Sequence, residues 1–183
     1  MKIAIGIPTG GIMTARTSLS IIETIRLNPF DFFPIFSHGN FAATNKEKIV
    51  KIVKEHNCTH LLLVDCDMQF SPNALPALLD HNKDIVGVHY NYRKLPKETV
   101  TKFFDDKRPE KLFKVAGIGT GFLLIKMSVF EKLSKPYFPM EWDNDGNFIL
   151  TEDIGFSEKA RKVGFNIWCD PNIIIKHLGE YAY

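Results

Sequence analysis

Short apolar segments alternate with longer amphipathic ones over the first ninety residues, and no other feature of the chain constrains its fold as strongly. The apolar segments have the length of β-strands and lie at 2–8, 32–36, 61–65 and 84–90. Between them, apolar residues recur at helical spacing over 15–25 and 42–55. Ser71 and Pro72 suit the N-cap and the first position of a third helix. Strands that alternate with helices build a mainly parallel sheet with helices on both faces, so we expect an α/β, Rossmann-like fold.

The second half of the chain is less regular and predicts an α+β arrangement. A polar stretch at 94–111 precedes a glycine-dense turn at 117–121, which leads into an apolar strand. The other expected elements are a helix opened by a Ser128-x-x-Glu131 capping box, a helix capped by Thr151 and ending near 163, and strands at 166–169 and 173–176. Residues 143–147 predict a hairpin turn. No linker or repeat divides the chain, so we expect one domain over residues 1–183.

The composition excludes several classes of protein. The 183 residues are 45% hydrophobic and 24% charged, a balance typical of a globular protein with a sizeable core. A net charge of +2 is too small for a protein that wraps nucleic acid or binds membranes through a polybasic surface. No apolar run approaches the roughly 20 residues of a transmembrane helix, and residues 1–8 do not form a secretory signal. Three cysteines without CxxC spacing predict neither a disulfide framework nor a zinc site, so we expect a cytoplasmic protein.

Two carboxylates follow the most apolar of the expected strands, in the sequence Leu61-Leu62-Leu63-Val64-Asp65-Cys66-Asp67. Residues i and i+2 of an extended chain point to the same side, and ligands of α/β sheets gather beyond the carboxyl ends of strands. Paired carboxylates at that place suit a hard divalent cation such as Mg²⁺ or Mn²⁺. The alternative is that both acids only end the strand and cap the next turn.

Two further groups of residues are candidates for chemistry. Glu152 and Asp153 lie in the first turn of an expected helix, where a carboxylate can act as a general base or can simply be favoured by the helix dipole. His177 follows an apolar segment and can complete a metal site or be an ordinary packed histidine. Cys66 is a poor nucleophile because the charges of Asp65 and Asp67 disfavour its thiolate.

The order of these motifs resembles one family. The chain carries Ile5-Gly6-Ile7-Pro8-Thr9, then Asp65-Cys66-Asp67, then residues 119–125, then Glu152-Asp153 and finally His177-Leu178-Gly179. In this order they resemble a small glycosyltransferase of GT-A fold, of the family-2-like kind found in bacteria, phages and other viruses. The resemblance runs from residue 2 to residue 179.

The resemblance implies a role for each matched residue. It places Pro8, Thr9 and Gly10 at the nucleotide, Asp65 at the ribose or the metal, and Asp67 and His177 at the metal. It makes Asp153 the catalytic base, with Glu152 in reserve, and puts Gly119 and Gly121 near the donor sugar and the acceptor. Residues 1–93 would then bind the nucleotide and residues 94–183 would carry the catalytic and acceptor-binding half.

The resemblance also implies the substrates and the cofactor. The donor would be a UDP- or GDP-sugar and the cofactor Mn²⁺, or Mg²⁺ in its place. The acceptor would bear a hydroxyl group and could be a glycan, a lipid, a protein or a modified nucleic acid. Three alternatives remain open, namely a phosphohydrolase of the haloacid-dehalogenase type, an inert nucleotide-sugar-binding domain and a nucleotidyltransferase. Gln69 argues against the phosphohydrolase, whose motif has Thr or Val at that position.

Overall fold

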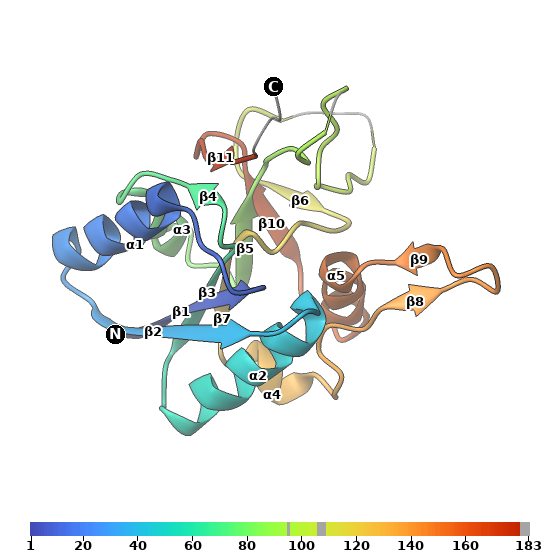
Figure 1. The fold of residues 1–183 in the computed structure, drawn as a ribbon, viewed down its shortest axis with the longest axis horizontal. Coiled ribbons are helices and arrows are strands. Elements are labelled where there is room, and N and C mark those ends of the chain that lie inside the picture. The colour runs from blue at the N-terminus through green and yellow to red at the C-terminus, as the bar shows by residue number, and fades with distance from the viewer. Residues whose placement is uncertain (95, 106–108, 180–183) are drawn as a thin grey trace.

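The structure is a computed structural model that describes residues 1–94, 96–105 and 109–179. The described residues form a mixed α/β fold around one large sheet (Figure 1). In the order in which they lie across this sheet, its seven strands are β2 (Asp31–His38), β1 (Lys2–Thr9), β3 (His60–Val64), β7 (Phe122–Lys126), β5 (Ile85–Val88), β10 (Ile167–Asp170) and β6 (Phe113–Val115). The pairs β1/β2, β1/β3 and β5/β10 are parallel, whereas β7 is antiparallel to both its neighbours and β6 is antiparallel to β10. Five of the seven strands therefore run in one direction, with β7 and β6 opposed to them, so the sheet is mostly parallel and consistent with a Rossmann-like fold, as the sequence predicts.

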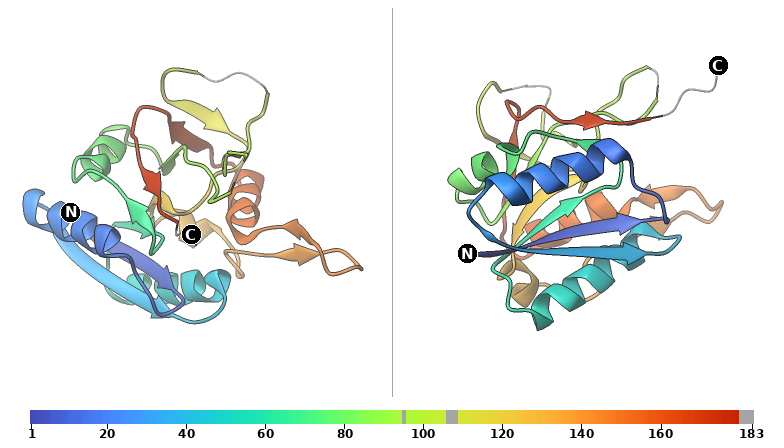
Figure 2. Two further views of the ribbon diagram at one scale, coloured as in Figure 1. Left: turned by 45° about the horizontal axis from the view of Figure 1, so that its top comes forward. Right: turned by 60° about the vertical axis from the view of Figure 1, so that its left-hand side comes forward.

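Helices cover both faces of the sheet, as Figure 2 shows for α1 and α2. The helices are α1 (Ala15–Leu27), α2 (Ala42–Glu55), α3 (Ala74–Asp80), α4 (Val129–Lys132) and α5 (Glu152–Lys162). The strand residues alternate between two apolar clusters, because successive side chains of a strand point to opposite faces. Ile3 and Ile5 of β1 pack with α1 and α3, while Ala4 packs with α2, α4 and α5. The chain thus buries a core on each side of the sheet.

Two small sheets complete the fold. Strands β8 (Glu141–Trp142) and β9 (Phe148–Leu150) form a hairpin that projects from the start of α5 (Figure 1). Its turn is closed by the Asp143 carboxylate, which accepts hydrogen bonds from the backbone N–H groups of Asp145 and Asn147. Strands β4 (Met68–Gln69) and β11 (Lys176–His177) pair antiparallel just beyond β3. The hairpin prediction is confirmed, whereas the strand expected at 173–176 is confined to its last residue and His177.

The expected helix caps differ from the observed ones. Helix α3 begins at Ala74 with Asn73 as its N-cap, so the prediction that Ser71 caps this helix is wrong. Ser71 instead closes a turn, since its Oγ accepts from Asn73 N–H at 3.3 Å and its carbonyl accepts from Ala74 N–H at 3.0 Å. Ser128 and Thr151 precede α4 and α5 as expected, but neither side chain makes a capping hydrogen bond. After Ser128, Val129 and Phe130 are buried in the core, whereas Glu152 and Asp153 after Thr151 form ion pairs with Lys46 of α2.

Strand β7 lies between β3 and β5, and this position brings the glycine-dense turn to the candidate site. Val64 at the end of β3 is paired with Phe122 at the start of β7. The turn 117–121 therefore lies beside the carboxyl end of β3, and Asp65 N–H donates to the Gly121 carbonyl at 3.0 Å. No helix of the described residues is long and apolar enough to span a membrane.

Candidate functional site

A pocket of about 310 Å³ opens beyond the carboxyl ends of β1 and β3. Its walls come from residues 8–10 at the end of β1, residues 65–67 after β3, the N-terminal parts of α2 and α5, and the residues around β11. These segments lie far apart in sequence and meet here because parallel strands end at one edge of the sheet. The pocket is thus where an α/β sheet of this kind places a ligand.

Local hydrogen bonds shape the loop that follows β1. Thr9 Oγ1 donates to the Ile12 carbonyl and accepts from Gly11 N–H, both at 3.0 Å. Gly11 has a φ of 116°, a backbone conformation that side chains with a Cβ rarely adopt. Asn45 of α2 holds the other side of the loop by donating to the Thr9 carbonyl at 3.3 Å. The backbone of Pro8, Thr9 and Gly10 is therefore fixed at the rim of the pocket.

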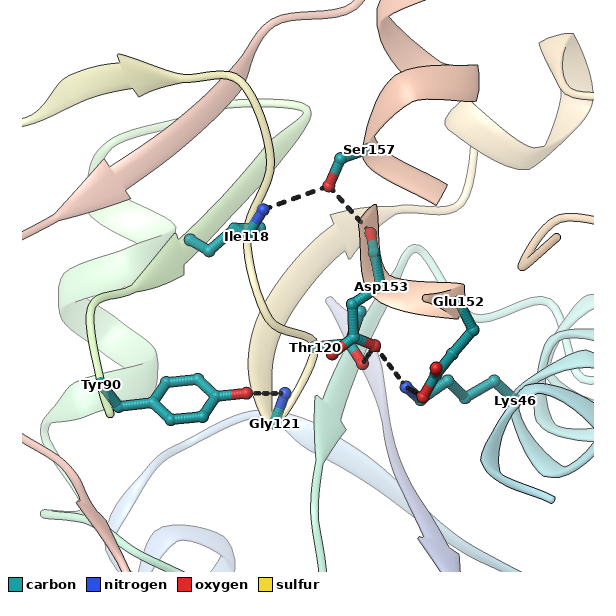
Figure 3. Close-up of polar contacts among 8 residues, drawn as sticks. All are labelled: Lys46, Tyr90, Ile118, Thr120, Gly121, Glu152, Asp153 and Ser157. Atoms are coloured by element: carbon teal, nitrogen blue, oxygen red, sulfur yellow. Dashed lines mark hydrogen bonds and ion pairs between the residues drawn. The ribbon is translucent and has the colours of Figure 1, made fainter. Parts of the chain in front are cut away.

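A buried lysine joins the two carboxylates at the start of α5 (Figure 3). Lys46 of α2 is 1% exposed, and its Nζ lies 3.0 Å from Glu152 Oε1 and 2.6 Å from Asp153 Oδ1. Thr120 Oγ1 donates a further hydrogen bond to the same oxygen of Asp153. Burial alone would lower the pKa of Lys46, but the charges of Asp153, Asp65 and Glu152 outweigh burial and hold that pKa well above its usual value. Lys46 is therefore a permanent cation that offsets the repulsion among neighbouring carboxylates.

The glycine-dense turn is tied to Tyr90, just after β5, and to Ser157 of α5 by hydrogen bonds (Figure 3). Gly121 N–H donates to Tyr90 Oη at 2.9 Å, and Ile118 N–H donates to Ser157 Oγ at 3.3 Å. Ser157 Oγ in turn donates to the Asp153 carbonyl at 3.0 Å. A Cβ on Gly121 would lie 2.6 Å from Tyr90 Oη and 2.8 Å from Asp65 Oδ2. The turn thus needs glycine because Tyr90 and Asp65 approach its backbone closely.

Asp67 and His177 lie side by side in the wall of the pocket. His177 Nδ1 lies 2.9 Å from the Asn91 carbonyl, which can only accept, so Nδ1 carries a proton and donates it. The other ring nitrogen, Nε2, lies 3.4 Å from Asp67 Oδ1, a buried oxygen that no hydrogen bond reaches. Arg93 takes the other oxygen of Asp67 at 3.0 Å. In the neutral histidine two acceptor atoms therefore face each other, an arrangement that a proton or a metal cation between them would stabilise.

The pKa shifts of this pair agree with that geometry. Burial acts to raise the pKa of Asp67, but the adjacent His177 and Arg93 outweigh burial and lower that pKa. Burial acts to lower the pKa of His177, but Asp67 and the Asn91 carbonyl outweigh burial and raise it. Both shifts favour a cation next to the Asp67 carboxylate.

The donor atoms at Asp67 and His177 fit a divalent cation whose other ligands come from water and a bound substrate. No group of three or more His, Cys, Asp or Glu side chains suited to hold a metal occurs within 1–94, 96–105 and 109–179. Mg²⁺ in proteins is commonly held by one or two carboxylates together with waters and substrate phosphates, so a complete protein cage is not required. The buried, unpartnered Oδ1 of Asp67 and the Nε2 of His177 supply such a partial set.

Asp65 lines the pocket and interacts electrostatically both with the Lys46–Asp153 pair and with the Asp67–His177 pair. Burial raises the pKa of Asp65 to about 6, Lys46 opposes this shift, and the charges of Asp153 and Asp67 add to it. The neighbouring Cys66 thiol also has a raised pKa, because of burial and the charges of Asp67 and Asp65. These surroundings disfavour the thiolate of Cys66, so the thiol is a poor nucleophile, as the sequence predicts.

The structure brings most of the expected site residues to one pocket. Its lining includes Pro8, Thr9, Gly10, Asp65, Asp67, Glu152 and His177. Asp153 lies behind Lys46, and Gly119 and Gly121 pack against Tyr90 instead of lining this pocket.

Four residues that the sequence analysis did not single out belong to the site: Lys46, Tyr90, Arg93 and Thr120. Lys46 left a signal in the sequence. It lies in the buried stripe of α2 with Ile49, Val50 and Val53, where a lysine is out of place unless it meets a carboxylate.

Comparisons with known proteins support the fold alone. No protein-family model matches the chain, and no curated protein sequence matches it. Among solved structures, the crystal structure of A197 from STIV matches with a TM-score of 0.69 and 18% sequence identity, over 98% of this chain and 87% of that chain. The two proteins therefore share their α/β architecture over nearly the whole length of this chain.

Proposed function

We propose that the protein is a metal-dependent glycosyltransferase of the GT-A type. It transfers a sugar from a UDP- or GDP-sugar to a hydroxyl group of an acceptor. The motifs that resemble this family support the proposal. Most of them line one pocket, although the segments from Pro8 to His177 are separated by up to about 170 residues in sequence.

The relation of Asp67 to His177 is the observation that carries the proposal. Asp67 Oδ1 is buried without a hydrogen-bond partner and faces His177 Nε2 at 3.4 Å. Leaving a buried carboxylate oxygen unsatisfied costs free energy, which such a site recovers when a cation binds. We assign Asp67 and His177 as the residues that would hold Mn²⁺ or Mg²⁺, with Asp65 beside them. When bound, the metal supplies Lewis acidity that offsets the negative charge on a departing diphosphate.

The remaining residues of the pocket, together with Asp153 and Thr120 next to it, would bind and orient the substrates and move a proton. The fixed loop of Pro8, Thr9 and Gly10 would contact the nucleotide. Asp153 would take the proton of the acceptor hydroxyl as the hydroxyl attacks the anomeric carbon. Lys46 and Thr120 both donate to Asp153 Oδ1, so they fix the orientation of the carboxylate. Glu152 lines the pocket and shares Lys46 with Asp153.

The test is isothermal titration of UDP and GDP, each with and without Mn²⁺. Binding of one nucleotide should require Mn²⁺ and should be lost in Asp67→Ala, whereas Asp143→Ala, in the exposed turn of the hairpin, should bind as the wild type does. Thermal unfolding of both variants would establish that they are folded.

Two results would contradict the proposal. One is the absence of binding by either nucleotide under all metal conditions. The other is full Mn²⁺-dependent binding in folded Asp67→Ala. Nucleotide binding without turnover of any nucleotide sugar would favour the inert binding domain.

A further inference from the structure

A second pocket adjoins the first and has a different chemical character. It measures about 630 Å³, a size typical of sites for small ligands, and it shares Arg93 and His177 with the first pocket. Its walls come from the segment after β5 and from the residues around β11. We refer to it as the basic pocket, defined by Arg93, Lys94, Lys97, Lys176 and His177.

Positive charge dominates the basic pocket. Arg93, Lys94, Lys97 and Lys176 line it, and no acidic side chain does so among the described residues. Arg93 is neutralised by Asp67, and Lys94 pairs with Glu98 at 2.6 Å, with both side chains about half exposed. For Lys97 and Lys176 no ion pair is found among the residues that the structure describes. Within 1–94, 96–105 and 109–179, at least two cations thus lie at a concave surface without an ion-pair partner, and such a surface attracts anions.

The kind of anion follows from the form of the pocket. Lysine ammonium groups act as point charges and bind phosphate well without demanding one fixed geometry. The half-exposed ring of Tyr92 and the partly apolar wall at Ile175 leave room for an organic group attached to that phosphate. A phosphate monoester or diester on a larger molecule therefore fits better than a small inorganic anion alone.

The position of the basic pocket suggests which substrate it serves. This step rests on the proposed function, which assigns the first pocket to the nucleotide sugar. A transferase needs its second substrate beside the first, and Arg93 and His177 form the boundary common to both pockets. We propose that the basic pocket binds a phosphate group of the acceptor, so that the natural acceptor is a phosphate-bearing molecule.

The first experiment measures phosphate binding in EDTA, so that no metal takes part. Glycerol 3-phosphate is titrated by NMR, and binding to vesicles with and without phosphatidic acid is measured by sedimentation, so a soluble source and a lipid source are distinguished. Lys97→Glu/Lys176→Glu should weaken binding of the preferred probe at least about tenfold, because two attractive charges become repulsive. Lys48→Glu/Lys51→Glu makes the same charge change on an exposed part of α2 and should alter binding less than about twofold.

The results that overturn the proposal are specific. Neither probe binding the wild type would overturn it, and so would equal losses in the two double variants, which indicate attraction to net charge alone. Metal-dependent titration of UDP and GDP with the same variants separates this proposal from the proposed function. If Lys97→Glu/Lys176→Glu loses nucleotide and phosphate binding together, the basic pocket holds the donor diphosphate and the acceptor role is overturned. If phosphate binds here but no nucleotide binds the wild type, the glycosyltransferase proposal fails and the acceptor role fails with it.

Discussion

Lys46 Nζ lies 2.6 Å from Asp153 Oδ1 and thereby links the N-terminal part of α2 to the first turn of α5, over 107 residues of sequence. The lysine also reaches Glu152 and is electrostatically coupled to Asp65. Three carboxylates in one place repel each other in a medium of low dielectric constant. The buried cation lets all three remain next to the pocket, so we regard Lys46 as the residue that makes this acidic site compatible with folding.

The free energy of unfolding of a Lys46 variant tests whether the lysine stabilises the acidic site. Lys46→Met keeps the length of the side chain and removes its charge, which leaves the partly buried Glu152 and Asp153 without this counterion. Removing one partner of a buried ion pair costs about 3–5 kcal/mol, and we expect the lower end because the two acids are 17% and 24% exposed. Unfolding in urea should therefore show a loss of about 3 kcal/mol.

Lys48 offers a matched control on the same helix. Its side chain is exposed and no ion pair is found for it among the described residues, so Lys48→Met should change the free energy of unfolding by less than about 0.5 kcal/mol. A loss in Lys46→Met as small as that in Lys48→Met would show that the carboxylates do not depend on the lysine.

The assignment of the catalytic base gives a second prediction. Asp153→Asn keeps the size of the side chain and can still accept from Thr120, but it cannot take a proton. We expect the metal-dependent hydrolysis of the nucleotide sugar, measured as release of UDP or GDP, to fall by a factor of about 10² or more. Glu152→Gln should reduce the same rate less than about tenfold.

Nucleotide affinity serves as the control for both variants. Neither side chain is assigned a contact with the nucleotide, so the dissociation constant for UDP or GDP should stay within about twofold of the wild type. The opposite ranking, with Glu152→Gln the slower variant, would transfer the role of base to Glu152, the acid that lines the pocket.

The close packing of the glycine-dense turn gives a third prediction. A methyl group on Gly121 would clash with Met68, Tyr90 and Asp65. The end of Met68 is flexible, but Tyr90 Oη is held by its hydrogen bond from Gly121 N–H and cannot retreat without breaking that bond. We expect Gly121→Ala to lower the free energy of unfolding by about 1–3 kcal/mol.

Gly10 provides the comparison, because a Cβ there would meet no atom within 4 Å. Gly10→Ala should leave thermal stability unchanged within about 0.5 kcal/mol, while any effect on nucleotide affinity would report on the loop after β1. Equal stability of Gly121→Ala and the wild type would mean that the turn can move away from Tyr90.

Local patterns explain which parts of the fold could be predicted from the sequence. Helix α2 matches its expected range of 42–55, because its apolar residues recur at helical spacing among lysines and glutamates. Strands β1 and β3 could be predicted equally well, because each is an apolar segment followed by a polar or flexible residue, Gly10 after β1 and Asp65 after β3. The placement of β7 between β3 and β5 had no local signal, since strand order depends on which faces pack together.

The site shows the same division between local and distant information. Asp65, Asp67 and Glu152 could be found because each follows a recognisable strand or opens a helix. The pairing of Lys46 with Asp153 could not, because it depends on how α2 and α5 are oriented over the sheet. Ser71 misled the helix prediction because a serine before proline can close a turn as readily as it caps a helix.

A buried thiol gives the last prediction, which concerns pH. Cys169 of β10 is 0% exposed, and burial, with the charge of Asp170 adding to it, raises the pKa of its thiol to about 12. In the unfolded chain this thiol ionises near about 8.5, so above that pH the unfolded state loses a proton that the folded state keeps. The contribution of Cys169 to stability is therefore complete below about pH 8 and declines by about 1.4 kcal/mol per pH unit between about pH 9 and pH 12.

Comparison of the wild type with Cys169→Ala isolates this effect, because all other titrating groups are common to both proteins. At pH 7 the free energy of unfolding of the variant should be lower by about 1–2 kcal/mol, owing to the lost packing of the sulfur atom, and this difference should stay constant up to about pH 8. From pH 8.5 to pH 10.5, denaturation in urea should show the two stability curves converging and then crossing, since only the wild type carries the thiol and loses about 2 kcal/mol over this interval. Curves that stay parallel over this interval would mean that Cys169 ionises in the folded protein as readily as in the unfolded chain, and that the interior of the sheet beside β5 is open to water.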